Sequence, residues 1–296
     1  MPRTVLHLLS AFFVGAASAA AGVAFYATCL DRHVDEARVV PAATAAVDMT
    51  DACAGEDELL SALPAEVAEV APAPAPALPP VPFEVFVHPD VDPEQPLPMV
   101  LALHGRGGSP QWFIRRIKKL RVPVRWVIPQ APRASGAGYA WLSRAPRHLE
   151  RERLVDELTR ASDQLAAMLP SLTERYPTDG RPIVVGFSQG AMVAWSLAVR
   201  HPEQIELAVP IAGFLPEPVG ETSRDPAGAR PRVIALHGRW DDRVELGAAR
   251  SSAKRATRLG VPVELRVHAE AGHQFTPRMR RELRRILDGE LANVGA

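Results

Sequence analysis

The chain has 296 residues, of which 47% are hydrophobic and 23% are charged, and these values are ordinary for one or two globular domains. Its 34 basic residues balance its 34 acidic residues, so the composition offers no basic surplus for nucleic acid, and we expect no nucleic-acid partner. The two cysteines, Cys29 and Cys53, precede the part that looks folded, and no Cys/His cluster has the spacing of a metal site.

The N-terminal third is predicted to deliver the protein rather than to carry its chemistry. Residues 4–30 contain no Asp, Glu, Lys or Arg, they are long enough to span a bilayer, and Arg3 precedes them. Because small residues there offer cleavage sites, residues 1–30 are predicted to be a signal peptide or an N-terminal transmembrane anchor. Residues 31–81 are acidic and rich in Ala and Pro, which predicts a disordered linker. We therefore expect an exported protein, membrane-anchored on the extracytoplasmic side or, after cleavage, secreted or periplasmic.

Residues 82–296 alternate short apolar runs with amphipathic stretches, which predicts an α/β domain with a mostly parallel sheet. The predicted strands cover residues 83–89, 98–105, 124–132, 182–187, 205–213, 232–238 and 263–270. The predicted helices cover residues 112–120, 149–172, 188–200, 246–260 and 278–290. The last of these is rich in Arg but interleaves its own acids, so we expect a solvated helix face there. Ligands of such sheets bind at the carboxyl ends of the strands.

A serine lies between two glycines where a predicted strand meets a helix, in the segment GFSQG at 186–190. The G-x-S-x-G arrangement is typical of a sharp elbow that exposes a nucleophilic hydroxyl at the edge of a sheet. The alternative is a helix N-cap serine between turn glycines. Because other polar segments also follow strands, we predict that Ser188 is a nucleophile.

A serine nucleophile needs a general base and a group that orients this base. His273 follows a strand and a flexible glycine in the segment AGHQF, and we predict that it is the base. Asp241 and Asp242 follow a buried strand and compete for the orienting role, while a helix cap or an arginine partner is the alternative for either. The chain order Ser, acid, His is that of α/β-hydrolases. His104 and His237 precede glycines at strand ends and are expected to brace loops by hydrogen bonding.

The segment LALHGRGGSP ends an early strand in a Gly-rich turn. The tetrahedral intermediate of acyl transfer needs two N–H donors about 3 Å from its oxygen. The residue after the nucleophile, Gln189, and Arg106 in this turn are predicted to supply these backbone donors. Gly105 in the same turn is predicted to contact substrate. The alternative is a plain Gly-rich turn with no role in chemistry.

Taken in order, the segments LALHGRGG, VIPQAP, GYAWL, GFSQGAMVAW, HGRWDDRV and AGHQF resemble the phospholipase/carboxylesterase family, which includes acyl-protein thioesterases and bacterial carboxylesterases. The resemblance covers about residues 82–290 and implies an α/β-hydrolase fold. The resemblance implies that Asp241 is the acid. It also implies that the backbone oxyanion donors of the family correspond to Arg106 and Gln189. Trp141 matches an aromatic residue that lines the acyl site in relatives, and its alternative is core packing.

The sequence therefore predicts a compact serine carboxylesterase without a large lid domain, acting on carboxylic esters or thioesters of a small molecule or lipid, with no cofactor or metal. One alternative is an exported peptidase or amidase of the same fold. The other is a tethered envelope-binding protein with a vestigial triad. Two features depart from the family: Arg106 stands where relatives usually carry a small or apolar residue, and export is unlike the cytosolic depalmitoylating enzymes. Protein depalmitoylation is not expected.

Overall fold

A computed structural model describes residues 80–219 and 230–294. The predicted leader at 1–30 and all but the last two residues of the predicted linker at 31–81 lie outside these residues. No helix in the described ranges is long and apolar enough to cross a membrane. Val81, which the sequence assigns to the linker, is 8% exposed and packs in the core, so the folded body includes it.

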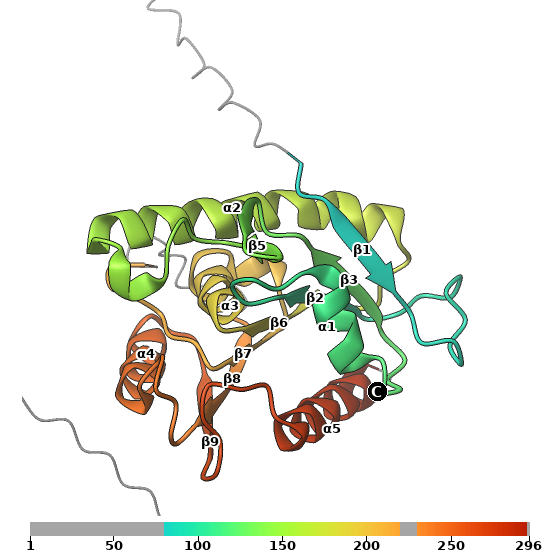
Figure 1. The fold of residues 1–296 in the computed structure, drawn as a ribbon. Helices are drawn as coiled ribbons and strands as arrows, with labels where there is room; N and C mark the ends of the chain where they lie inside the picture. Colours follow the sequence, from blue (N-terminus) through green and yellow to red (C-terminus); the bar gives the residue numbers. More distant parts are fainter. Residues whose placement is uncertain (1–79, 220–229, 295–296) are drawn as a thin grey trace, which may run out of the picture. The chain divides into compact units, whose positions relative to one another are not determined.

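The body is built on a seven-stranded sheet (Figure 1). In spatial order its strands are β1 (Phe83–Phe86), β3 (Arg125–Pro129), β2 (Met99–Leu103), β6 (Ile183–Phe187), β7 (Leu207–Ile211), β8 (Arg232–Gly238) and β9 (Val263–His268). Strand β1 pairs antiparallel with β3, and all the other pairs in this sheet are parallel. This confirms the predicted, mostly parallel sheet. The carboxyl ends of β2, β6, β7, β8 and β9 therefore meet at one edge.

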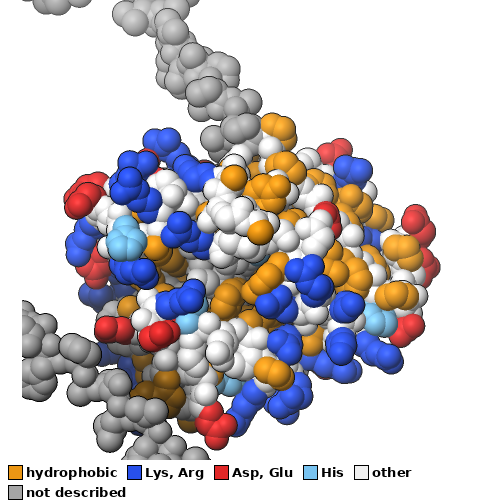
Figure 2. All heavy atoms as spheres, in the orientation of Figure 1, with side chains coloured by type: hydrophobic (Ala, Val, Ile, Leu, Met, Phe, Trp, Pro, Cys, Tyr) orange, Lys and Arg blue, Asp and Glu red, His pale blue; other side chains and the backbone are white. Residues whose placement is uncertain are grey.

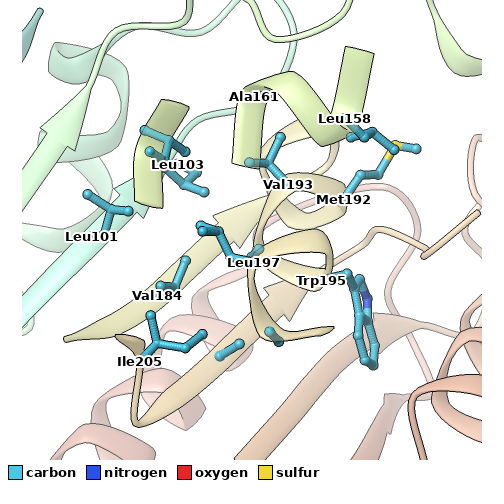
Figure 3. Packing of buried hydrophobic residues seen from close by; sticks show 14 of the residues in the cluster. Leu101, Leu103, Leu158, Ala161, Val184, Met192, Val193, Trp195, Leu197 and Ile205 are labelled. Atoms are coloured by element: carbon cyan, nitrogen blue, oxygen red, sulfur yellow. The ribbon is translucent and has the colours of Figure 1, made fainter. Parts of the chain in front are cut away.

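Helices cover both faces of the sheet, because alternate residues of a strand point to opposite sides. In β2, Met99, Leu101 and Leu103 belong to one core cluster, whereas Val100 and Ala102 belong to another. The first cluster, part of which Figure 3 shows, includes residues of α2 (Arg151–Arg175), α3 (Gln189–Arg200) and α4 (Leu246–Arg258). The second includes residues of α1 (Pro110–Ile117) and α5 (Pro277–Val294).

All predicted strands and helices are present, with ends that differ by a few residues. Helix α2 begins at Arg151 rather than at 149, because the residue before it, Glu150, has an extended backbone with ψ of 149°. Four short elements were not predicted: the hairpin strands β4 (Arg133–Ser135) and β5 (Gly138–Ala140) and the 3₁₀ turns η1 (Pro146–His148) and η2 (Pro202–Gln204). Strands and turns of three residues are too short to show a periodic pattern. None of these elements, within the described residues, forms a lid domain.

Candidate active site

Ser188 lies in a strained turn between β6 and α3. Its φ of 55° and ψ of −115° are values that residues with a side chain rarely adopt. The Ser188 N–H donates to the carbonyl of Ile211 in β7 at 2.9 Å, which ties the turn to the neighbouring strand. Ser188 occupies the N-cap position of α3, but its side chain makes no capping hydrogen bond. The hydroxyl is thus left to interact with other side chains, and the N-cap alternative does not hold.

The two glycines of the elbow are required by close backbone contacts. A Cβ on Gly186 would overlap the carbonyl oxygen of Gly190. A Cβ on Gly190 would overlap the carbonyl oxygen of Leu103 at the end of β2. Because both obstacles are backbone atoms, no side-chain rotation relieves them. The G-x-S-x-G spacing therefore brings the start of α3 directly against β6 and β2.

Three side chains from three strand ends meet at this elbow. Ser188 follows β6, Asp241 follows β8 and His273 follows β9. The Ser188 Oγ lies 2.8 Å from Nε2 of His273, and Nδ1 of His273 lies 2.9 Å from Oδ2 of Asp241. Nδ1 must carry the proton that it shares with the carboxylate, which leaves Nε2 of a neutral ring free to accept the serine hydroxyl. This is the geometry of an activated serine.

Asp241 is buried, at 5% exposure, and it is held in place by more than His273. Its Oδ1 accepts the N–H groups of Arg243 at 3.0 Å and of Val244 at 2.8 Å. Burial by itself would raise the pKa of Asp241, but the hydrogen bonds from His273 and from these backbone N–H groups outweigh it and lower the pKa. Asp242 is exposed. The geometry therefore places Asp241, rather than Asp242, beside the histidine.

The two other strand-end histidines brace loops, the role expected of them. Nδ1 of the fully buried His104 donates to the carbonyl of Gly105 at 2.8 Å, and its Nε2 accepts the N–H of Ala131 at 3.2 Å. Nε2 of His237, which is 1% exposed, donates to the carbonyl of Val244 at 2.8 Å. Burial lowers the pKa of both rings, which favours their neutral form.

The hairpin of β4 and β5 clamps the Gly-rich turn that follows β2. The N–H of Gly107 donates to the carbonyl of Tyr139, and the N–H of Tyr139 donates to the carbonyl of Gly108, both at 2.8 Å. Gly105 faces the elbow, where a Cβ would lie 3.1 Å from Cβ of Ser188. Gly105 thus lets the turn approach the serine closely. The hairpin is not among the elements predicted from the sequence, although its Gly-Ala-Gly turn is a signal for one.

Two backbone N–H groups are available beside Ser188. Among the described residues, the N–H of Arg106 donates to no backbone carbonyl. Gln189 is the first residue of α3, where an N–H has no acceptor within the helix. Both residues line the cavity that Ser188 lines. The residues of both predicted oxyanion donors therefore line the same cavity as the nucleophile.

The side chain of Gln189 is 2% exposed and ties the elbow to the segment after β5. Its Oε1 accepts the N–H groups of Trp141 and Leu142 at 3.2 and 3.4 Å, and its Nε2 donates to the carbonyl of Arg144 at 3.1 Å. Trp141 is 1% exposed, and its Nε1 donates to the carbonyl of His104 at 2.8 Å. Trp141 packs in the core and does not line the cavity at Ser188. Its position supports the core-packing alternative over substrate contact.

A cavity of about 620 Å³, which we call the serine cavity, opens beside the elbow. Apart from Ser188, Gln189, His273 and Arg106, it is lined by Met192, Phe214, Val244, Ala248, Ala145, Pro146, Arg147, Arg243 and Glu245. None of these last nine residues was predicted from the sequence to be a site residue. Two of them carried a signal: Met192 lies one helical turn after the serine, and Phe214 follows β7 at the same sheet edge. In the described part of the chain, no group of three or more His, Cys, Asp or Glu is arranged to hold a metal ion.

Residues 85–289 match the profile of the phospholipase/carboxylesterase family. A curated relative, the putative esterase NocK of Nocardia uniformis subsp. tsuyamanensis, is 29% identical over 154 residues, which are 49% of this chain and 40% of that protein. The chain thus spans about two fifths of the length of this relative.

Several solved structures share the fold. Esterase PE8 has a TM-score of 0.62 at 22% identity and covers 71% of this chain and 99% of its own. The Bacillus cereus carboxylesterase has a TM-score of 0.58 at 16% identity, and the match covers 71% of this chain and 94% of that protein. The Zea mays acyl-protein thioesterase 2 has a TM-score of 0.57 at 21% identity, and the match covers 71% of this chain and 99% of that protein. At these identities the likeness concerns the fold, and it confirms the predicted α/β-hydrolase architecture.

Proposed function

The chain belongs to the phospholipase/carboxylesterase family of hydrolases, and from this premise we propose that it is a serine esterase acting on carboxylic esters. The observation that carries the proposal is the contact of 2.8 Å between Oγ of Ser188 and Nε2 of His273, with Asp241 on the other ring nitrogen. A hydroxyl placed in this way can lose its proton as it attacks a carbonyl carbon.

Acylation begins when His273 accepts the proton of Ser188 and the serine oxygen attacks the ester carbonyl. The N–H groups of Arg106 and Gln189 donate to the oxygen that becomes negative. Asp241, whose lowered pKa favours the ionised form, stabilises the imidazolium. His273 then gives its proton to the oxygen of the leaving alcohol as the ester bond breaks. The acyl group remains on the serine.

Water completes the cycle. His273 removes a proton from a water molecule whose oxygen attacks the acyl-enzyme carbonyl. The bond to Ser188 breaks, the serine recovers the proton, and the carboxylic acid leaves. A thioester would follow the same steps with a thiol as the leaving group.

The serine cavity is the proposed site of the acyl group. The carbonyl carbon must lie at Ser188 and its oxygen at the N–H groups of Arg106 and Gln189, and all three residues line this cavity. The apolar side chains of Met192 and Phe214 on its wall suit an alkyl chain.

The alternative of a binding protein with a vestigial triad requires that the three side chains lie outside hydrogen-bond distance of one another. The distances of 2.8 and 2.9 Å between the three side chains lie within hydrogen-bond range and therefore favour an enzyme. A peptidase or amidase would use the same three side chains, so activity on esters and on activated amides must be compared directly.

The test is hydrolysis by the purified full-length protein of nitrophenyl esters from acetate to palmitate, of one acyl-thioester and of one nitroanilide. Ser188→Ala should lower ester turnover by about 10⁴-fold or more, because the nucleophile is lost. A variant that keeps wild-type turnover would overturn the proposal. Turnover of the nitroanilide without turnover of any ester would assign the amidase instead.

We also propose that residues 1–81 carry the body out of the cytoplasm, because residues 4–30 contain no charged side chain. A fusion of residues 1–81 to alkaline phosphatase, an enzyme that becomes active only after export, tests this proposal. An active fusion is the expected result, and an inactive fusion that stays in the cytoplasm would overturn it.

A further inference from the structure

A second cleft, of about 600 Å³, is lined by residues of α1 and α5, and we call it the α1/α5 cleft. It shares His273 with the serine cavity. Its cationic lining residues are Arg115, Arg116, Lys119, Arg280 and Arg281. No acidic side chain lines it within the described residues. Figure 2 shows Lys and Arg side chains gathered over these two helices.

The positive charge of the α1/α5 cleft is not balanced by neighbouring acids. Within the described ranges, none of its five cations forms an ion pair with a carboxylate. Elsewhere on the same helix α5, Arg284 pairs with Asp288 and Arg285 pairs with Glu282. Five cations without an ion pair among the described residues therefore lie together in this cleft, whereas Arg284 and Arg285 on the same helix are paired.

Two of these guanidinium groups are fixed in place. Arg116 lies 3.3 Å from the centre of the Trp112 ring and donates to the Trp112 carbonyl at 3.0 Å. Arg280 donates to the carbonyl of Phe275 at 2.8 Å. Burial, followed by the positive charges of Arg280 and Arg115, lowers the pKa of Arg116. A guanidinium has five N–H donors, so each of the two has donors left for an anion, which would also relieve their mutual repulsion.

A stack of rings joins this cleft to the triad. The Trp112 ring stacks on Phe187 at 5.6 Å between centres, and the Phe187 ring lies 5.4 Å from that of His273. His273 is the group that must protonate the leaving alcohol, whereas the acyl group is assigned to the serine cavity. The α1/α5 cleft, which His273 also lines, is therefore the site left for the alcohol half of an ester.

We propose that the α1/α5 cleft binds an anionic group, such as a phosphate, phosphonate or carboxylate, carried by the alcohol half of the ester substrate. Arg116 and Arg280 contact the anion, and Arg115, Lys119 and Arg281 add positive potential. The inference rests on the proposed ester hydrolysis at Ser188. It gives the substrate a charge that the fold alone does not specify.

The test compares two soluble esters on the full-length protein: the butyrate of 4-hydroxybenzylphosphonate and that of its uncharged dimethyl ester. The acyl group and the phenol are the same, so the charge is the main difference. The wild type should prefer the phosphonate. The double variant Arg116→Gln/Arg280→Gln should lower kcat/KM for the phosphonate by about 10-fold or more, because hydrogen bonds to a charged group are lost. The ratio of kcat/KM for the phosphonate to that for the neutral ester should fall by a similar factor, and retained turnover of the neutral ester shows that the variant is folded.

The matched control is Arg284→Gln/Arg285→Gln, which also removes two positive charges but takes them from residues of α5 that do not line the cleft. It should leave the ratio of kcat/KM for the two esters close to the wild-type ratio. A wild type without preference for the phosphonate, or equal effects of the two double variants, would overturn the inference. A third outcome is that the wild type sediments with phosphatidylglycerol vesicles, only the cleft variant loses this binding, and the wild type shows no preference for the soluble phosphonate. That outcome would assign the cleft to a lipid surface and would also overturn the inference.

A binding measurement separates this inference from the proposed function. The product 4-hydroxybenzylphosphonate is titrated calorimetrically into the wild type and both double variants. Binding that is weakened only in Arg116→Gln/Arg280→Gln supports the anion site even if no ester is hydrolysed. Absence of binding to the wild type argues against the anion site even if the neutral ester is hydrolysed at Ser188.

Discussion

The serine cavity and the α1/α5 cleft share His273 but are built from opposite faces of the sheet. The serine cavity takes Met192 from α3 and Ala248 from α4, which cover one face. The α1/α5 cleft takes four of its five cations, all except Lys119, from the two helices that cover the other face. The triad stands at the sheet edge, where the two meet. With the acyl group proposed for one site and the leaving group for the other, a substitution on one face of the sheet should leave the preference set by the other face intact.

The largest expected effect comes from the shared centre. Asp241→Asn should lower kcat by about 10⁴-fold for every ester, because the imidazole loses its orienting carboxylate. The matched control is Asp242→Asn, at the exposed neighbouring position, and it should retain wild-type rates. Steady-state kinetics on neutral and anionic esters measures both variants. Equal losses in the two variants would contradict the assignment of the acid.

A change on the serine-cavity face should alter acyl preference alone. Ala248 is half-buried on the cavity wall, and Ala248→Phe fills part of that space. We expect kcat/KM for long acyl chains to fall by about 10- to 100-fold relative to acetate, since lost apolar contacts of this size are worth about 1–3 kcal/mol. The preference for an anionic alcohol should not change. A shift in that preference would show that the two sites are coupled.

The smallest expected effect concerns the support behind the serine cavity. Glu157 of α2 accepts the N–H of Ser143 at 2.7 Å and its hydroxyl at 2.6 Å, which fixes the segment that Gln189 also holds. Glu157→Gln should lower the free energy of unfolding by about 1–3 kcal/mol at neutral pH. Burial would raise the pKa of Glu157, but hydrogen bonds from Ser143 and Arg153 lower it below 4.5.

A carboxylate with a lowered folded pKa contributes its full stability above the unfolded pKa and loses it as the pH falls through the folded pKa. The difference between the wild type and Glu157→Gln should therefore be full above pH 4.5 and shrink below it. Urea denaturation across this range measures it. A difference that stays constant with pH would show that the charge of Glu157 has no part in it.

The chemistry-bearing residues of the shared centre could be predicted because local signals mark them. Ser188 lies between two glycines that no residue with a side chain can replace in the elbow. His273 follows a strand and a glycine. The choice between Asp241 and Asp242 was open from the residues alone. It depends on which carboxylate turns inward to His273, and adjacent positions do not reveal that.

The α1/α5 cleft could not be predicted from sequence patterns. The Arg-rich end of the chain was expected to be a solvated face, which holds for Arg284 and Arg285 with their acidic partners. Arg280 instead lines the cleft with Arg116. These two residues are far apart in the sequence, and only packing of both helices on the same face of the sheet brings them together. Trp141, by contrast, was named from the sequence as a residue that could contact substrate. Its match to a family position did not reveal that the side chain is buried.

The most direct test of the central claim is to label the purified protein with a fluorophosphonate and to locate the label by peptide mass spectrometry while ester turnover is followed. The serine oxygen should displace fluoride and form a bond to phosphorus. We expect one label per chain, on Ser188, with turnover lost in proportion to labelling. An unlabelled Ser188, or turnover that persists after Ser188 is fully labelled, would contradict it.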